Sequence, residues 1–163
     1  MASAVLDPAV SASVAASAGT GKTWLLTARI VRLLLAGAKP GGILAIWCYG
    51  LFECDPAVDR LVADFSRDVV GPWWPRERRH VEEGYRDLLP PFPALDAPRF
   101  EMQADWEFDA VFGYLGTWSA VRRALIRTRR NPLGLLEAPL RSAWGAGARR
   151  VRWPLVLRVH RVR

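Results

Sequence analysis

Apolar and polar positions along the chain fall into runs and periods that predict alternating strands and helices. Apolar runs predict short strands at residues 10–15 and 43–49, and the second run is typical of a strand buried on both faces. Residues 22–36 between them carry a helical pattern. Since strand–helix–strand crossovers are right-handed, we expect residues 10–49 to form a right-handed βαβ unit.

Helical periodicity dominates the middle of the chain. It predicts helices at residues 57–70, 76–85, 108–125 and 133–144. The first should begin at Asp55-Pro56, because Asp caps helix N-termini and Pro fits the first helical turn. The third keeps its apolar spacing from Phe108 to Leu125 and is expected to be one continuous helix.

Two-residue alternation predicts strands at residues 99–107 and 151–159. Pro154 interrupts the second strand and cannot donate a ladder hydrogen bond, so this strand should lie at an edge or carry a bulge. The expected fold class is therefore α/β, with a small, partly parallel mixed sheet covered by helices.

Composition narrows the class of protein. A chain of 163 residues with 51% hydrophobic residues and eight Trp fits an ordered domain of ordinary size, and its net charge of +7 permits anionic partners. Its apolar runs are far shorter than the roughly 20 residues of a membrane span. Cys48 and Cys54 have no metal-ligand spacing, and the N-terminus lacks the pattern of a secretory signal. We expect a cytoplasmic protein with reduced thiols and no membrane partner.

The sharpest motif is a phosphate-binding loop at residues 16–23. It consists of Ala16, Ser17, Ala18, Gly19, Thr20, Gly21, Lys22 and Thr23. In such a loop the backbone N–H groups surround phosphate oxygens, the lysine reaches the outer phosphates and the threonine hydroxyl binds Mg²⁺. The motif predicts ATP and Mg²⁺ binding, with Thr23 holding the metal only when nucleotide is bound.

Coupled hydrolysis is not expected. ATP hydrolysis needs a carboxylate to hold Mg²⁺, and no Asp or Glu occurs between Asp7 and Glu53.

Residues 15–46, AASAGTGKTWLLTARIVRLLLAGAKPGGILAI, resemble the N-terminal segment of DNA helicases of the UvrD/Rep/RecB/AddA type. In that family the following strand ends in a T-F-T run, whereas this chain continues with Trp47, Cys48 and Tyr49. The resemblance covers less than a third of the chain and implies nucleotide binding in a helicase-type fragment.

The remainder resembles the C-terminal part of a class I S-adenosylmethionine-dependent methyltransferase, in the branch that includes trans-aconitate methyltransferases. Three blocks carry the likeness: WCYGLFECDPAVDRLVADFSRDVVGPWWPRERRHVEEGYRDLLPPF, WEFDAVFGYLGTWSAVRR and RRVRWPLVLRVHRV. The resemblance implies S-adenosylmethionine as cofactor, a small-molecule methyl acceptor and an antiparallel final strand pair. It also implies an acceptor pocket lined by Tyr49, Trp106, Tyr114 and Trp118, with Trp73 and Trp74 as further candidates.

The methyl-donor site of that family is missing. An early strand, a glycine-rich E-x-G-x-G-x-G loop and a ribose-binding acid are all absent. We therefore expect a composite chain, with a helicase-type segment at 1–46, a methyltransferase-like portion at 47–163 and a junction near Ile46–Trp47, packed as one domain. Half of a Rossmann-like methyltransferase sheet would be absent, so self-association through an exposed sheet edge is expected.

Plainer interpretations stay open. The aromatic candidates also fit a buried core, His80 a solvated helix and His160 an exposed strand position. Arginines cluster at positions 76–79, 122–123 and 127–130, where they could hold carboxylate-bearing substrates, contact nucleic acid or form a solvated face. Three functions follow: a methyltransferase-like protein without a complete active site, an ATP-binding helicase fragment, or a non-enzymatic basic binding module.

Overall fold

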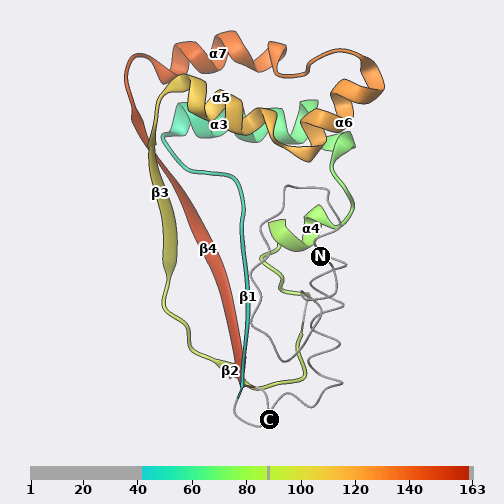
Figure 1. Cartoon of the computed structure of the whole chain (residues 1–163), viewed down its shortest axis with the longest axis vertical. Helices are drawn as coiled ribbons and strands as arrows, with labels where there is room; N and C mark the ends of the chain where they lie inside the picture. Colours follow the sequence, from blue (N-terminus) through green and yellow to red (C-terminus); the bar gives the residue numbers. More distant parts are fainter. Residues whose placement is uncertain (1–41, 88, 162–163) are drawn as a thin grey trace, which may run out of the picture.

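The computed structural model describes residues 42–87 and 89–161 (Figure 1). The phosphate-loop motif, the expected strand at 10–15 and the expected helix at 22–36 lie outside these residues. The described elements are β1 (Ile43–Tyr49), α3 (Pro56–Asp64), the π-helical turn η1 (Phe65–Val69), the 3-10 turn η2 (Gly71–Trp73), α4 (Arg78–Glu82), β2 (Ala94–Leu95), β3 (Phe100–Trp106), α5 (Phe108–Gly116), α6 (Ser119–Thr128), α7 (Gly134–Trp144) and β4 (Arg149–Arg161).

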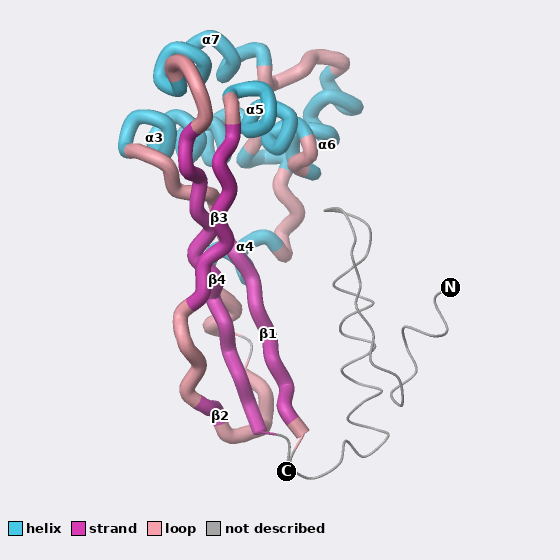
Figure 2. The backbone as a smooth tube through the Cα atoms, turned by 60° about the vertical axis from the view of Figure 1, so that its left-hand side comes forward, coloured by secondary structure: helices cyan, strands magenta, loops and turns pink. Residues whose placement is uncertain are grey.

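The last strand, β4, lies at the centre of the sheet. On one side it pairs with β1, from Ile43 opposite Arg161 to Tyr49 opposite Leu155. On its other side it pairs with β3 along its first half and with β2 near its end. Figure 2 shows these strands extending away from the helices, most of which gather at one end of the sheet.

The α/β class is confirmed, and so is the antiparallel pairing of the last two long strands, β3 and β4. The expected parallel pairing is not found among the described strands, because every one of their pairs is antiparallel. Strands β1 and β3 do run in the same direction, but β4 separates them.

The strand that contains Pro154, β4, was expected to lie at an edge of the sheet or to carry a bulge. The first alternative is wrong, because β4 has partners on both sides. After Tyr49 pairs with Leu155, the next bridge joins Glu53 to Arg152, so three residues of one segment face two of the other. This is a bulge, as the other alternative predicted, with the extra residue on the β1 side. Arg152 N–H donates to Glu53 O at 2.9 Å. Pro154 lies two residues beyond Arg152 in β4, so its backbone nitrogen faces the same neighbouring segment. Because this nitrogen carries no hydrogen, the bond that it cannot donate falls within the bulge.

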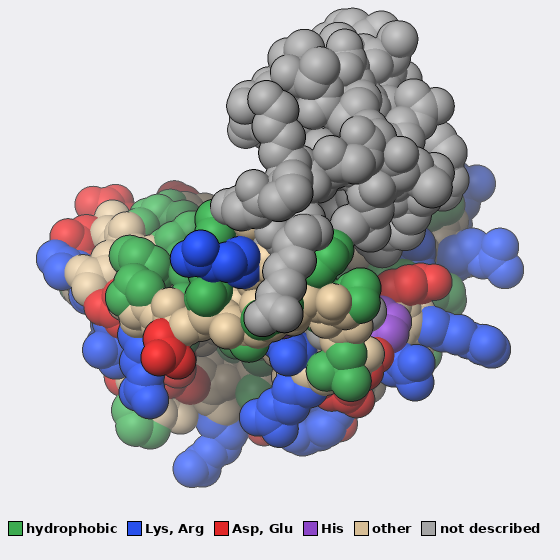
Figure 3. Space-filling view, turned by 90° about the horizontal axis from the view of Figure 1, so that it is seen from below, with side chains coloured by type: hydrophobic (Ala, Val, Ile, Leu, Met, Phe, Trp, Pro, Cys, Tyr) green, Lys and Arg blue, Asp and Glu red, His purple; other side chains and the backbone are tan. Residues whose placement is uncertain are grey.

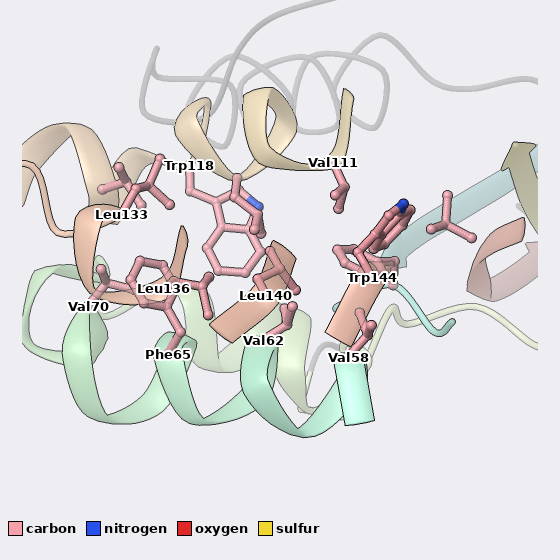
Figure 4. Packing of buried hydrophobic residues seen from close by; sticks show 14 of the residues in the cluster. Val58, Val62, Phe65, Val70, Val111, Trp118, Leu133, Leu136, Leu140 and Trp144 are labelled. Carbon is pink, nitrogen blue, oxygen red and sulfur yellow. The ribbon is translucent and has the colours of Figure 1, made fainter. Parts of the chain in front are cut away.

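The hydrophobic core lies between the helices and the adjoining end of the sheet (Figure 4). Its largest fully buried side chains include Val58 and Val62 from α3, Leu115 from α5, and Leu140 and Trp144 from α7. Within α3 and α7 these residues are four positions apart, so each pair lies on one helix face. Burying a side chain of this size stabilises the fold by about 1.5–3 kcal/mol.

The expected continuous helix over residues 108–125 is interrupted. Helix α5 ends at Gly116, and α6 begins at Ser119. Between them Trp118 has φ −59° and ψ 132°, which is not helical, and the Thr117 hydroxyl donates to Tyr114 O at 2.7 Å. A hydroxyl bonded to a carbonyl of the preceding turn competes with helix continuation. The apolar spacing concealed the break because both helices face the same core.

Strand β1 is not buried on both faces, contrary to the expectation. Ile43 and Trp47 are 57% and 56% exposed, whereas Cys48 on the opposite face is buried. Helix α4 and the segment that follows it cover that face. The Cys48 thiol contacts Val81 O of α4 at 3.8 Å, and His160 Nδ1 lies 3.0 Å from Phe92 O.

His160 is thus buried and not at the exposed position expected for it. It has 5% of its surface exposed.

Candidate functional site

An open hollow of about 560 Å³ lies beside the C-terminal end of β1. Leu51 lines it just after this strand, Ser66 and Arg67 line it from η1, and Trp74 lines it from the turn after η2. Arg76, Arg78, Arg79 and Glu82 complete the charged part of the lining, so basic groups outnumber acidic ones. We refer to this feature as the basic hollow.

Trp74 and Arg78 form a stacked pair within the basic hollow. The indole N–H of Trp74 donates to Ser66 O at 3.1 Å, which fixes the ring. The guanidinium carbon of Arg78 lies 4.6 Å from the centroid of this ring, and its Nε donates to Glu82 Oε1 at 3.3 Å. Stacking on an aromatic face restricts a guanidinium while leaving N–H donors free at its edge. Arg78 therefore presents a positioned cation to an anionic ligand.

The other three arginines of the hollow differ in their partners. Arg67 is bound to Asp64 and Asp68 at 2.6 and 2.8 Å, and these hydrogen bonds raise its pKa. Arg76 and Arg79 form no ion pair with any residue in the part of the chain that the structure describes. Arg78 pairs with Glu82 through Nε only, so its terminal N–H groups remain for a ligand, and Arg76 and Arg79 supply the unpaired charges of the hollow.

Three of the four predicted acceptor residues meet in one aromatic cluster. The ring of Tyr114 lies 5.3 Å from that of Trp106 and 6.3 Å from that of Trp118. Trp118 is buried and lies 5.4 Å from the ring of Trp74, which connects the cluster to the basic hollow. Trp153 also joins the cluster and its indole N–H donates to Tyr114 Oη at 3.4 Å.

Tyr49, the fourth predicted residue, lies at the end of β1 and is 37% exposed. Partial burial raises the pKa of its phenol, the charge of Tyr114 raises it further, and Arg78 opposes both effects. Burial likewise raises the pKa of the Cys48 thiol, again against the charge of Arg78. None of the four predicted residues lines the basic hollow itself, and their role in acceptor binding stays a prediction.

Sequence reasoning identified Trp74 and the arginines at 76–79 as candidates but missed Leu51, Ser66 and Arg67. The available signal was Gly71-Pro72, which turns the chain so that residues 74–79 fold back beside the helix. The π-helical turn at Phe65–Val69, of a kind often found at functional sites, leaves no clear pattern in the sequence.

His80, expected to be solvated, is paired with Asp87 at 2.5 Å. The His80 ring of α4 is therefore not simply solvated, and helical periodicity gave no indication of its contact with Asp87.

The described residues do not fit S-adenosylmethionine as a cofactor. A donor loop needs several glycines between a strand and a helix, but the turn from β1 to α3 contains only Gly50. The acid in this turn that caps α3, Asp55, already accepts hydrogen bonds from Ala57 N, Val58 N and Arg149. Nor do residues 42–87 and 89–161 contain a group of three or more His, Cys, Asp or Glu arranged to hold a metal ion.

Comparisons with known proteins confirm the composite resemblance. The family model of the UvrD/REP helicase N-terminal domain matches residues 2–47. A solved structure, described as a "putative type II methyltransferase" from Anaeromyxobacter dehalogenans, is 43% identical with a TM-score of 0.74. The match covers 83% of this chain and 58% of that one, so the chain spans little more than half the length of the methyltransferase. No functionally curated protein matches the chain.

The chain thus combines a helicase-type N-terminal segment with a methyltransferase-like fold. Among the described helices, none has the length and apolar character needed to cross a membrane.

Proposed function

We propose that the methyltransferase-like part binds a small carboxylate-bearing molecule in the basic hollow and that the chain alone transfers no methyl group. The observation that carries this proposal is the stacking of Arg78 on Trp74. Arg76 and Arg79, which form no ion pair among the described residues, line the same hollow. A fixed guanidinium binds a carboxylate through paired hydrogen bonds at low entropic cost. The resemblance of residues 47–163 to the branch that includes trans-aconitate methyltransferases suggests a small-molecule acceptor as the ligand class, and the structural likeness supports the methyltransferase-like fold.

Binding can be measured by calorimetry with succinate and citrate at constant ionic strength. Succinamide, which has the same carbon skeleton as succinate without its charge, serves as the ligand control. Arg78→Met keeps much of the side-chain bulk and should weaken binding about 10- to 100-fold, the value of a charged hydrogen-bonded contact. Arg150→Met, which removes an arginine paired with Asp105 in the sheet, is the matched protein control and should bind normally.

Two results contradict the proposal: equal binding of succinamide and succinate, or no change in Arg78→Met. Either result would show that the arginines of the basic hollow form a solvated surface and do not bind a carboxylate ligand.

The second candidate function is nucleotide binding at the phosphate loop. The match of residues 2–47 to a helicase N-terminal domain includes Ala16 to Thr23 and favours this candidate. The proposed role is ATP binding with Mg²⁺ on Thr23, in a fragment that lacks the remaining parts of a motor. The third candidate, a basic module without catalysis, rests on the net charge of +7.

We also infer that the protein acts in the cytoplasm and associates with itself through β1. No described strand pairs with the side of β1 opposite β4, and Ile43 and Trp47 on this strand are more than half exposed. An unpaired strand edge of this kind is a template for pairing with another chain. Sedimentation velocity of the wild type and of Trp47→Lys tests the inference, because the charged variant should be monomeric at concentrations where the wild type associates.

A further inference from the structure

Helix α6 and the residues just after it carry a cluster of arginines on the surface. The cluster consists of Arg122, Arg123, Arg127, Arg129 and Arg130, and all five are exposed. No acidic residue occurs between Asp109 and Glu137, so no residue near them in the sequence compensates their charge. We call these five residues the α6 arginine cluster.

The α6 arginine cluster has no acidic partners among the described residues, unlike several other arginines on the surface. Arg67, Arg141 and Arg150 form ion pairs with neighbouring acids, and on the face shown in Figure 3 basic and acidic side chains are interspersed. None of the five guanidinium groups forms an ion pair or a hydrogen bond with a residue that the structure describes; Arg130 bonds to the Thr128 hydroxyl only through its backbone. Their charges are therefore available to an external anion.

Stability of α6 does not account for the cluster. Cations are favourable near a helix C-terminus, which explains Arg127 and the two residues beyond it. Arg122 and Arg123 lie in the first half of α6, where the helix dipole offers no such benefit. The buried residues of α6 are Ser119, Ala120, Val121 and Ala124, and this mainly apolar face makes no use of the arginines.

We propose that the α6 arginine cluster binds the phosphate backbone of duplex nucleic acid without reading its sequence. A helix of ten residues is about 15 Å long, and duplex DNA carries a charge about every 1.7 Å along its axis, so the cluster faces several phosphates at once. Arg123 and Arg127 are neighbours at i and i+4 and can contact successive phosphates. This surface is separate from the basic hollow and does not depend on the proposed acceptor.

The side chains between the arginines favour a duplex over other polyanions. Single-stranded nucleic acid is bound by stacking on aromatic rings, but α6 contains no aromatic residue. A bilayer surface calls for several bulky apolar or aromatic side chains to insert, and α6 exposes only Leu125 and Ile126. Charge without stacking groups fits the regular phosphates of a duplex.

The test is fluorescence anisotropy of a labelled 20-base-pair DNA duplex of arbitrary sequence, titrated with the full chain between 50 and 200 mM NaCl. The triple variant Arg122→Gln, Arg123→Gln, Arg127→Gln is compared with Arg141→Gln, Arg150→Gln, Arg152→Gln, which removes the same charge from paired positions outside the basic hollow. We expect the first triple to reduce the slope of log K against log salt by up to about 2.7, or about 0.9 for each phosphate that is no longer neutralised. The control triple should retain the wild-type slope.

Three further ligands distinguish a duplex from other polyanions. A scrambled duplex should bind like the first, a single-stranded oligonucleotide more weakly, and anionic phosphatidylglycerol vesicles more weakly still. The triple Arg→Lys variant at positions 122, 123 and 127 preserves charge and should retain most of the affinity. Circular dichroism checks that all three triple variants are folded.

Equal losses in the two glutamine triples would assign binding to net charge and overturn the proposal. Tighter binding to vesicles than to the duplex, lost in the first triple, would overturn it in favour of a membrane surface.

Discussion

The carboxylate of Asp55 connects the start of α3 to the start of β4 through an ion pair with Arg149. Its Oδ1 accepts the backbone N–H groups of Ala57 and Val58 at 3.0 and 3.2 Å, and its Oδ2 accepts a hydrogen bond from Arg149, 94 residues further along the chain. The same carboxylate thus caps a helix and fixes a strand that forms the centre of the sheet.

Replacing Asp55 separates these two roles. Asp55→Asn keeps a capping oxygen and loses the charge, so it should cost no more than about 1 kcal/mol, since the ion pair is partly exposed. Asp55→Ala also removes the cap and should cost about 1 kcal/mol more. Urea unfolding of both variants, with Arg149→Met as partner in a double-mutant cycle, measures the effects. Equal stabilities for Asp55→Asn and Asp55→Ala would show that the cap contributes nothing.

Trp144 is expected to tolerate a smaller aromatic ring. It is fully buried, and its indole N–H has no hydrogen-bond partner among residues 42–87 and 89–161. Trp144→Ala should cost about 3–5 kcal/mol because it leaves a large cavity. Trp144→Phe should cost at least about 2 kcal/mol less, on the order of 1–2 kcal/mol, since it also removes an unsatisfied buried donor. Chemical denaturation compares the two, and similar losses would mean that the N–H is bonded.

The titration of Cys48 reports the charge of Arg78. Burial raises the pKa of this thiol above its usual value of 9.0, while Arg78 lowers it. Removing that charge in Arg78→Met should therefore raise the pKa further. The pH dependence of alkylation by iodoacetamide, measured in a Cys54→Ser background, should shift to higher pH in the variant. A shift to lower pH, or none, would place Arg78 away from the thiol.

The same pKa shift has a consequence for stability. A raised pKa means that the folded state holds the thiol proton more tightly than the unfolded chain does. The contribution of Cys48 to the free energy of unfolding is fully present below the pKa that its thiol has in the unfolded chain. It is lost as the pH rises through the higher pKa of the thiol in the folded protein.

The boundaries of β1 were predictable because an apolar run stands between Gly42 and Gly50. Its pairing was not, because the run itself contains no information about which strand lies beside it. Helical period located α5 and α6. The break between them, where the Thr117 hydroxyl bonds to Tyr114 O, leaves the apolar spacing intact and so was not predictable from it. Pro154 signalled an irregularity in the ladder, and only the position of Glu53 opposite Arg152 shows where it lies.

The sequence indicated which residue types the candidate site contains better than it indicated how those residues contact one another. Tryptophans and arginines near residue 75 were evident as candidates. The stacking of Arg78 on Trp74 depends on how η2 turns the chain, and the hydrogen bond from Trp74 to Ser66 O joins residues eight positions apart across that turn. Local patterns do not determine such contacts.

S-adenosylmethionine should not bind to the chain alone. The described residues offer no donor loop, and Asp55 is committed to the cap of α3. Calorimetric titration should show no stoichiometric binding at micromolar concentrations, and no methyl transfer should follow. Micromolar, stoichiometric binding would require a donor site of a different kind.

Phosphate binding at residues 16–23, if the second candidate function holds, should be weak and local. Backbone N–H groups and Lys22 attract phosphate without an acidic metal ligand, so Mg²⁺ should add little. ATP, GTP and inorganic triphosphate should therefore bind alike, and Lys22→Ala should weaken all three. DNA should not stimulate ATP turnover. A strong, Mg²⁺-dependent preference for ATP would show that the rest of the chain completes a nucleotide site.

The central position of β4 has a consequence for synthesis on the ribosome. Strands β1, β2 and β3 all pair with β4 and none pairs with another, yet β4 follows all of them in the chain. Pairings between residues distant in sequence form slowly, and here they must wait for translation as well. A nascent chain synthesised as far as residue 148 holds three complete strands and none of the described strand pairs. During that interval the apolar side chains of β1 lack their strand partner, and we expect the unfinished chain to be more prone to aggregation than the complete one.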